Sequence, residues 1–417
     1  MITTLPTGES LVAGDFRMSG EFRVAEDFRA DIARGVLDVR PLIDRMQPPV
    51  VVFPTAAGHA TGPSSQADLF EFERFLNRVA VRVGGPAFKL SADFNAAPRS
   101  GLELAVSKRL LGEHGGVGSA WVAAAEQEEA IIAAALASSF ETQFVPTKVQ
   151  SFDGAVLRAY TAGDPRSKAV ALISPCGMPA KLCERWMRLL AREYFVLVWE
   201  TRLLFDEPGD IEAKAFDVQA QVGDLFAVLD HFSVGKAHLM GLCGGAVIAV
   251  SAAAARPERV SSLSLWHGDF ELGPGCPKMK HQKDLKAFMQ FAALGRVQAG
   301  QLHKMFTQNT AKTFRDDWAH VVLYPYANSE LLYRYAQANG NIMETNVTPL
   351  LPQVVQPALV VTSEDDTTTH PDSSRRVAEL LPNARLHVMA HGDHLSVFHA
   401  GPDITELALE FLAQERV

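Results

Sequence analysis

The sequence has few cysteines and no long apolar run, and both absences narrow the class of protein. The chain of 417 residues contains four cysteines, Cys176, Cys183, Cys243 and Cys276, and their spacing fits no zinc-binding pattern. A chain of this size needs no disulfide bonds to fold, so we expect reduced thiols in a cytoplasmic protein. The most apolar stretch, residues 246–255, is about half of the ~20 residues that span a bilayer. We therefore expect a buried helix there and no membrane span.

The sequence also lacks the basic clusters that bind nucleic acid, and its first residues do not resemble a secretory leader. The formal net charge is −9, and no run of lysine and arginine occurs, so we expect no nucleic-acid partner. The first residues contain no basic segment followed by an apolar one, so we expect no secretory signal. No metal or cofactor is expected either. Hydrophobic residues make up 47% and charged residues 21%, which is typical of a globular protein with a sizeable core.

The sequence pattern changes near Phe144. Beyond it, short runs of Val, Ile and Leu alternate with helical patterns, which predicts a mostly parallel sheet with helices on both faces. The expected strands are 145–150, 156–160, 169–173, 195–199, 237–240, 260–266, 358–361 and 385–389. The expected helices are 180–193, 218–232, 245–255, 371–381 and 404–412.

Two regions depart from this alternation. Between Phe270 and Pro357 the strand pattern stops and amphipathic stretches appear, so we expect a helical lid at about 271–355. The alternative is a packed helical extension that gates nothing. Residues 1–143 carry no catalytic motif and predict a small α+β accessory domain, with a partner-docking surface or a wall of the site entrance as alternatives. Its expected elements are helices at 68–83 and 123–136 and extended segments at 50–53 and 89–94.

The sharpest chemical signal is a Gly-x-Cys-x-Gly motif centred on Cys243. It joins an apolar strand to a helix rich in Ala and Val, the context of a nucleophile elbow. Gly241 and Gly245 occupy the positions where larger side chains would collide with neighbouring backbone. The N–H of Gly244 would face a developing oxyanion, and the N-terminus of the helix favours a thiolate. The alternative is a glycine-rich turn around a structural cysteine.

With this elbow, residues 144–417 resemble the α/β-hydrolase superfamily in strand order, acid loop and histidine loop. The resemblance implies an α/β-hydrolase domain and a second oxyanion donor after an earlier strand. That loop reads Cys176-Gly177-Met178, where many relatives have His-Gly-x, which indicates the N–H of Met178. Cys176 is either a second reactive thiol or a small buried side chain.

The same resemblance implies an acid followed by a histidine. Many relatives carry Gly-x-x-Asp after the seventh expected strand, and here Ser363 replaces the Gly and the frame selects Asp366. Its neighbour Asp365 is the residue most easily mistaken for it. Asp269, at the end of the sixth expected strand, is the alternative acid, because some hydrolases place the acid there.

The base is expected after the last strand. The family pattern Gly-x-His selects His394 within the segment 389–396, while His391 and His399 are expected at the surface or beside the site. In the implied mechanism His394 removes the proton of Cys243 and Asp366 stabilises the imidazolium. The resulting thiolate attacks a carbonyl and forms an acyl-thioester enzyme.

A cysteine nucleophile narrows the reaction. Attack of a thiolate on a thioester gives another thioester, so the acyl group stays activated and can pass to a second thiol. This argument predicts an acyl- or aminoacyl-transferase that works on phosphopantetheine thioesters of a carrier protein or CoA. The alternative is a thioesterase or esterase with the same triad of Cys243, His394 and Asp366. A polymerase similar to the polyhydroxyalkanoate synthases, or an inactive hydrolase fold that serves as a binding module, is a further alternative.

Cysteine elbows occur in three groups of the superfamily. These are the aminoacyltransferases that move aminoacyl groups between carrier proteins in nonribosomal peptide biosynthesis, the polyhydroxyalkanoate synthases and the dienelactone hydrolases. The long N-terminal extension resembles the first group. Polyhydroxyalkanoate synthases also have such extensions, but their Gly-Ser-Gly-His loop is only partly matched by residues 391–394. Dienelactone hydrolases are shorter and lack the lid.

Overall fold

A computed structural model gives the architecture of most of the chain. It describes residues 25–53, 66–91, 100–111, 128–205, 214–309 and 318–414. Parts of two predicted N-terminal elements, residues 92–94 and 123–127, lie outside these ranges.

The centre of the molecule is an eight-stranded sheet with the order β10-β9-β8-β7-β5-β6-β4-β3. Only the pairs β3–β4 and β4–β6 are antiparallel, so the predicted mostly parallel sheet is confirmed. Its strands are β3 (Thr147–Gln150), β4 (Val156–Ala162), β5 (Ala169–Ile173), β6 (Phe195–Trp199), β7 (Ala237–Leu242), β8 (Val260–Trp266), β9 (Ala358–Ser363) and β10 (Ala384–Met389). Strands β5, β6 and β8 have the predicted bounds, whereas β3 begins two residues later than predicted.

Helices cover both faces of the sheet because β5, β6 and β7 are buried on both sides. One face packs against α7 (Val218–His231), α8 (Gly245–Ala255) and α13 (Pro371–Leu380). The other packs against α6 (Glu184–Leu190) and α15 (Pro402–Gln414). The single helix predicted at 180–193 is instead a 3₁₀ turn, Ala180–Cys183, followed by α6. Helix α7 begins where the Asp217 side chain accepts a hydrogen bond from the N–H of Ala220 at 2.8 Å.

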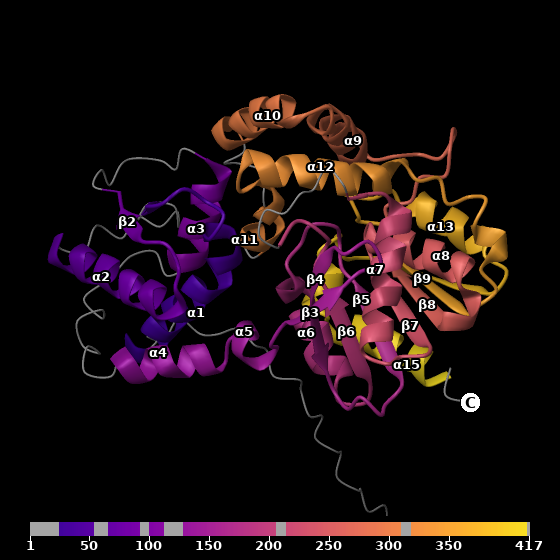
Figure 1. Cartoon of the computed structure of the whole chain (residues 1–417), viewed down its shortest axis with the longest axis horizontal. Coiled ribbons are helices and arrows are strands. Elements are labelled where there is room, and N and C mark those ends of the chain that lie inside the picture. Colours follow the sequence, from indigo (N-terminus) through magenta and orange to yellow (C-terminus); the bar gives the residue numbers. More distant parts are fainter. Residues whose placement is uncertain are drawn as a thin grey trace, which may run out of the picture.

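The segment between β8 and β9 forms a helical layer over the sheet (Figure 1). It consists of α9 (Lys280–Ala293), α10 (Arg296–Asn309), α11 (Ala319–Val322) and α12 (Ser329–Glu344). Helix α12 packs against α9 and α10 and also reaches α7 of the main domain. The expected lid is therefore helical where the structure describes it, and its gating role stays a prediction.

The N-terminal unit packs against this helical layer rather than standing apart from it. Its elements are α1 (Ala25–Ile43), β1 (Val50–Val52), α2 (Gln66–Val83), β2 (Phe88–Leu90), α3 (Gly101–Leu111), α4 (Glu128–Ala137) and α5 (Phe140–Gln143). Strands β1 and β2 form a parallel pair, and α1 and α3 contact α11 and α10 (Figure 1). The sequence predicts α2 and β1 but neither α1 nor α3.

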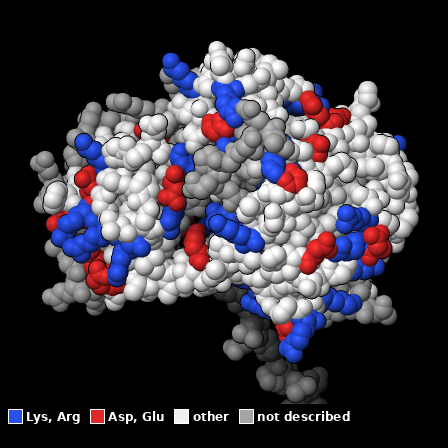
Figure 2. Space-filling model, viewed as in Figure 1, with Lys and Arg blue, Asp and Glu red and all other residues white. Residues whose placement is uncertain are grey.

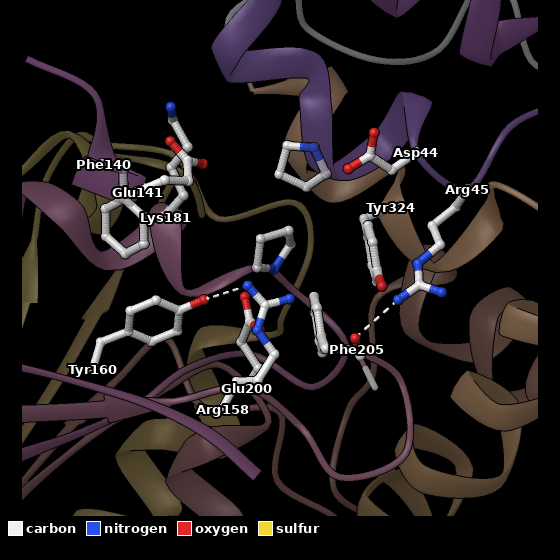
Figure 3. A pocket seen from close by; sticks show the side chains of 12 residues that line it. Asp44, Arg45, Phe140, Glu141, Arg158, Tyr160, Lys181, Glu200, Phe205 and Tyr324 are labelled. Atoms are coloured by element: carbon white, nitrogen blue, oxygen red, sulfur yellow. Dashed lines mark hydrogen bonds and ion pairs between the residues drawn. The ribbon is translucent and has the colours of Figure 1, made fainter. Parts of the chain in front are cut away.

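A polar cavity of about 260 Å³ lies where the N-terminal unit meets the sheet and the lid. Figure 3 shows two arginines among its lining side chains, each in a hydrogen bond with another lining residue. Arg158 donates to the hydroxyl of Tyr160 at 2.9 Å and lies 3.4 Å from a carboxylate oxygen of Glu200. Arg45 donates to the carbonyl of Phe205 at 2.9 Å. The contact of Arg45 joins the N-terminal unit to the main domain, whereas the contacts of Arg158 lie within the main domain.

The surface mixes charges of both signs. On the face in Figure 2, Lys and Arg side chains are interspersed with Asp and Glu side chains and form no continuous basic patch. Within the described part of the chain, no helix is both long enough and apolar enough to cross a bilayer.

Candidate active site

Cys243 lies at a sharp turn between β7 and α8. Its backbone φ is +53°, in the left-handed region that costs an L-residue about 1–2 kcal/mol. The N–H of Cys243 donates to the carbonyl of Trp266 at 2.9 Å, which anchors the turn to β8. The thiol is partly exposed. This geometry is that of a nucleophile elbow, with the sulfur presented at the carboxyl end of the sheet.

The two glycines around Cys243 allow the chain to turn this tightly. A β-carbon at Gly241 would lie 2.6 Å from the Cα of Ala246, and one at Gly245 would overlap the carbonyl oxygen of Ile173. Real β-carbons do not approach backbone this closely, so both positions require glycine.

The structure brings His394 and Asp366 together in the loops that follow β10 and β9. The Nδ1 of His394 lies 3.0 Å from Oδ2 of Asp366, and both side chains are buried. Burial lowers the pKa of His394, but the charge of Cys243 and hydrogen bonds with Asp366 and Cys243 outweigh it and hold this pKa well above its usual value. His394 therefore interacts with the predicted acid and the predicted nucleophile at once.

Asp366 is held as an anion by several donors. Its Oδ1 accepts from the N–H groups of Thr368 at 2.8 Å and Thr369 at 2.9 Å, and its Oδ2 accepts from the Thr369 hydroxyl at 2.8 Å. Burial raises the pKa of Asp366, but the hydrogen bonds from His267 and His394 dominate and hold it far below its usual range.

His267 is a site residue to which the sequence analysis gave no role. It directly follows β8, is completely buried, and its Nδ1 lies 2.8 Å from the same Oδ2 of Asp366. The signal was present, because a polar residue at the carboxyl end of a parallel strand lies at the edge where such sites form. The sequence analysis assigned a role only to the aspartate of the segment Trp266-His267-Gly268-Asp269.

The alternative acids lie elsewhere. The Oδ1 of Asp269 accepts from the Gln282 amide at 2.7 Å, and within the described ranges Asp269 makes no hydrogen bond with His394. Asp365 is more than half exposed and pairs with His391, which is itself at the surface. His399 accepts from the Trp318 indole at 3.4 Å. Of the candidate acids, Asp366 alone among the described residues bonds His394.

Cys243 and His394 line a cavity of about 680 Å³ beneath the lid. Met178, Gly244 and Asp269 also line it, from the ends of three different strands. The opposite wall comes from α9, α12 and Tyr326, through residues to which the sequence assigned no role: His281, Gln282, Leu285, Tyr326, Tyr335 and Asn339. Their amphipathic spacing indicates a packed helix but does not show that it packs over the nucleophile.

Two amides were predicted to stabilise an oxyanion, and they differ in their present partners. The N–H of Gly244 donates to no other group of the described residues, whereas the N–H of Met178 closes a turn onto the carbonyl of Pro175 at 3.2 Å. Gly177, with φ +75°, lets α12 approach, because a β-carbon there would lie 2.7 Å from the Tyr335 ring. Gly244 is thus free to serve an oxyanion, while Met178 would have to release a long hydrogen bond.

The other thiols differ from Cys243. Cys176 lines the cavity but is almost completely buried, and this burial raises its pKa to about 12 although Thr201 lowers it. Cys183 is buried away from the cavity, and burial raises its pKa to about 12 as well. A protonated, buried Cys176 fits a packing role better than that of a second nucleophile.

Within the described residues, His267, Asp366 and His394 also form a group whose spacing could suit a metal, with ligand atoms within 4.8 Å of one another. Both Nδ1 atoms, however, face Asp366 Oδ2 at hydrogen-bonding distance, and Thr369 donates to the same oxygen. A metal would have to displace these protons, so the cluster is better described as a hydrogen-bond network.

The sequence is similar to that of known hydrolases. A family model described as the alpha/beta hydrolase fold matches residues 177–400. A putative carbamate hydrolase RutD of Stutzerimonas stutzeri is 22% identical over 259 residues, which are 60% of this chain and 94% of the relative. A 2-hydroxy-6-oxo-6-phenylhexa-2,4-dienoate hydrolase of Comamonas testosteroni is 24% identical over 235 residues, which are 51% of this chain and 77% of the relative.

Solved structures agree on the fold. MGS-M2, an alpha/beta hydrolase enzyme from a deep-sea metagenome library, aligns with a TM-score of 0.53 at 19% identity and covers 65% of this chain and 98% of its own. A hydrolase from Pseudomonas aeruginosa aligns with a TM-score of 0.50 at 20% identity, over 64% of this chain and 98% of its own. These matches include almost the whole of each relative and about two thirds of this chain.

Proposed function

Because this chain belongs to the alpha/beta hydrolase family, we propose that it is a cysteine-dependent acyl hydrolase acting on thioesters or activated esters. The observation that supports this proposal is the position of Cys243. It occupies a left-handed elbow, interacts with the buried pair His394 and Asp366, and faces a cavity.

The first half of the reaction forms an acyl enzyme. Since Nδ1 of His394 faces Asp366, its Nε2 takes the proton of the Cys243 thiol, and the sulfur attacks the carbonyl carbon of the substrate. The N–H of Gly244, joined by that of Met178, stabilises the oxyanion. When the tetrahedral intermediate collapses, the bond to the leaving group breaks and the leaving thiol or alcohol takes its proton from His394.

The second half releases the acyl group to water. His394 removes a proton from the water molecule, the hydroxide attacks the thioester carbonyl, and the thiolate of Cys243 leaves. The products are a free carboxylic acid and the regenerated pair of Cys243 and His394. The carbamate and dienoate hydrolases reported above support water as the acceptor rather than the thiol acceptor that the sequence alone favours.

Transfer to a second thiol is the second candidate, and the sulfur of Cys243 is the observation that favours it. Exchange between thioesters is close to thermoneutral, so an acyl group on Cys243 keeps its reactivity towards the phosphopantetheine of CoA or of a carrier protein. An aminoacyl group is one acyl group that such a site could carry. An acceptor thiol must then outcompete water at the same acyl enzyme.

Intact-mass measurement separates these functions. The protein is mixed with acetyl-CoA, and the mass of the enzyme and the released products are followed with and without an added thiol such as N-acetylcysteamine. Hydrolysis gives free acid at a rate that the thiol does not change, whereas transfer gives the new thioester at the expense of the acid. Cys243→Ala should form no adduct, and Cys176→Ala serves as the matched control. If wild type forms neither adduct nor product with a panel of acyl thioesters, the binding-module alternative replaces both functions.

A further inference from the structure

Four neighbouring strands end in four residues of one hydrogen-bonded cluster. Cys243 follows β7, His267 follows β8, Asp366 lies in the loop after β9 and His394 lies in the loop after β10. The proposed mechanism uses Cys243, Asp366 and His394. His267 has no part in it, yet it lies between the nucleophile and the acid in strand order.

The two histidines contact the same oxygen atom. Nδ1 of His267 and Nδ1 of His394 lie 2.8 Å and 3.0 Å from Oδ2 of Asp366, and the imidazole rings meet edge to face with centroids 5.5 Å apart. The Thr369 hydroxyl donates to this oxygen as well, at 2.8 Å. The negative charge of Asp366 is therefore shared among three side-chain donors, and His394 receives only part of it.

The backbone of His267 is strained in the same sense as that of Cys243. Its φ is +48°, and its N–H donates to the carbonyl of Val361 at 2.9 Å. A histidine in the left-handed region costs about 1–2 kcal/mol, and such strain is concentrated at functional sites. The turn directs the imidazole at Asp366.

The protonation of His267 fixes its role as a donor. Burial lowers its pKa, only partly opposed by the hydrogen bond with Asp366, so the ring is neutral. A neutral ring that donates from Nδ1 leaves Nε2 as an acceptor, and Nε2 has no hydrogen-bond partner within the described part of the chain. An unsatisfied buried acceptor costs about 1–3 kcal/mol. The ring thus makes one polar contact of consequence, with Asp366.

We propose that His267 is a positioning residue that fixes the Asp366 carboxylate and limits how strongly this carboxylate stabilises the protonated form of His394. The inference rests on the proposed function, since it concerns the same acyl-enzyme chemistry. By withdrawing part of the charge of Asp366, His267 keeps the His394 imidazolium acidic enough to return its proton to the leaving group.

Other titratable groups around His394 must be held constant in a test. Cys243 faces His394 from the elbow, and Asp366 and His267 face it from the strand ends. His281 on α9 interacts with His394 electrostatically. Asp393 precedes His394 in the chain and also interacts electrostatically with His267. When His267 alone is replaced, the other four groups keep their identity, so the replacement removes one donor.

Three variants separate a positioning role from a structural one. His267→Gly removes the donor and relieves the left-handed strain. His267→Asn keeps a nitrogen donor at the δ position and tolerates this backbone conformation. Thr369→Val removes another donor to the same oxygen with almost no change of shape, so it carries the test if the glycine variant does not fold.

The readout is the pH dependence of alkylation of Cys243 by iodoacetamide, followed by intact mass. A Cys276→Ser background removes the other partly exposed thiol. The alkylation rate of Cys243 should change on the alkaline side of the pH profile where His394 loses its proton. In His267→Gly and Thr369→Val, the midpoint of this alkaline step should move to higher pH by about 0.5–1 pH unit, the equivalent of one hydrogen bond. His267→Asn should return the step towards its wild-type position, and kcat for acetyl-CoA turnover should fall in the glycine variant.

Each outcome is decisive. An unshifted alkaline step in the folded glycine and valine variants overturns the proposal, and so does an asparagine variant that behaves like glycine. Failure of the proposed function can be distinguished from failure of this proposal, because alkylation of Cys243 needs no substrate. A wild-type protein that shows the alkaline step but forms no acyl adduct contradicts the function and leaves the assignment of His267 to be judged by the variants.

Discussion

A β-carbon at Gly245 would overlap the carbonyl oxygen of Ile173, so α8 begins in direct contact with the end of β5. We therefore expect Gly245→Ala to destabilise the protein by about 3 kcal/mol, because the overlap can be relieved only by moving the backbone of the elbow. The same movement should abolish alkylation of Cys243 in any protein that remains folded. Thermal unfolding and iodoacetamide labelling measure the two effects.

The matched control is Gly300→Ala in α10. A β-carbon there would meet nothing within 4 Å, and alanine favours helix by about 0.5–1 kcal/mol over glycine. This variant should be as stable as wild type or slightly more stable, with unchanged labelling. Equal stability of the two alanine variants would show that the contact between α8 and β5 is not as tight as described.

Substitutions of two adjacent aspartates, Asp366 and Asp365, test which of them is the acid of the triad. Asp366→Asn should lower kcat/KM for thioester turnover by about 10²–10⁴-fold, because a neutral amide cannot stabilise the His394 imidazolium or accept from both histidines. Asp365→Asn should change kcat/KM by no more than about twofold, because the Asp365 carboxylate is largely exposed and pairs with the surface residue His391 rather than with His394. A larger loss in Asp365→Asn than in Asp366→Asn would reassign the acid.

Docking of the N-terminal unit depends on Asp38 of α1. This carboxylate pairs with Lys181, just after the loop of Met178, and with Arg109 of α3. Burial raises the pKa of Asp38, but the two cations outweigh it and hold the pKa below its usual value, so the pairing stabilises the fold above that value and is lost in acid. We expect Asp38→Asn to cost about 1–3 kcal/mol at neutral pH, measured by urea unfolding.

Asp44, which directly follows α1, provides the control. It is 3.3 Å from Arg40, is more exposed than Asp38, and burial raises its pKa. Removing its charge in Asp44→Asn should therefore leave the free energy of unfolding unchanged or slightly higher. A loss in Asp44→Asn equal to that in Asp38→Asn would mean that the ion pairs to α3 and to Lys181 contribute little.

The sequence predicts those parts of the fold whose cause is local. Strands β5 and β6 are apolar on both faces and appear as short apolar runs rich in Val and Leu, so their bounds follow from composition alone. The elbow is equally local, because Gly241 and Gly245 must both be small for the turn around Cys243 to close. Asp366 and His394 follow from their places after the last two strands.

The parts that were missed depend on contacts between distant segments. His267 meets Asp366 across 99 positions, and nothing near His267 in the sequence records that contact. Tyr335 shows only the spacing of an amphipathic helix, whereas its position against Gly177 depends on how the whole lid packs. Helix α1 is likewise held by Lys181 and by lid residues far along the chain.

The last prediction concerns His238, which lies in β7 between two serine hydroxyls. Its Nδ1 and Nε2 are 2.8 Å and 2.9 Å from the Oγ atoms of Ser262 and Ser264, and complete burial lowers its pKa from 6.5 to about 3. The unfolded chain takes up this proton near pH 6.5 and the folded protein only near pH 3, so stability is complete above pH 6.5 and falls as the pH decreases through this window. One proton corresponds to a slope of about 1.4 kcal/mol per pH unit, which His238→Gln should remove from the acid side of the urea-unfolding profile. His320, whose pKa burial also lowers to about 3, is common to both proteins and cancels in the comparison, so equal slopes would mean that His238 is protonated in the folded sheet.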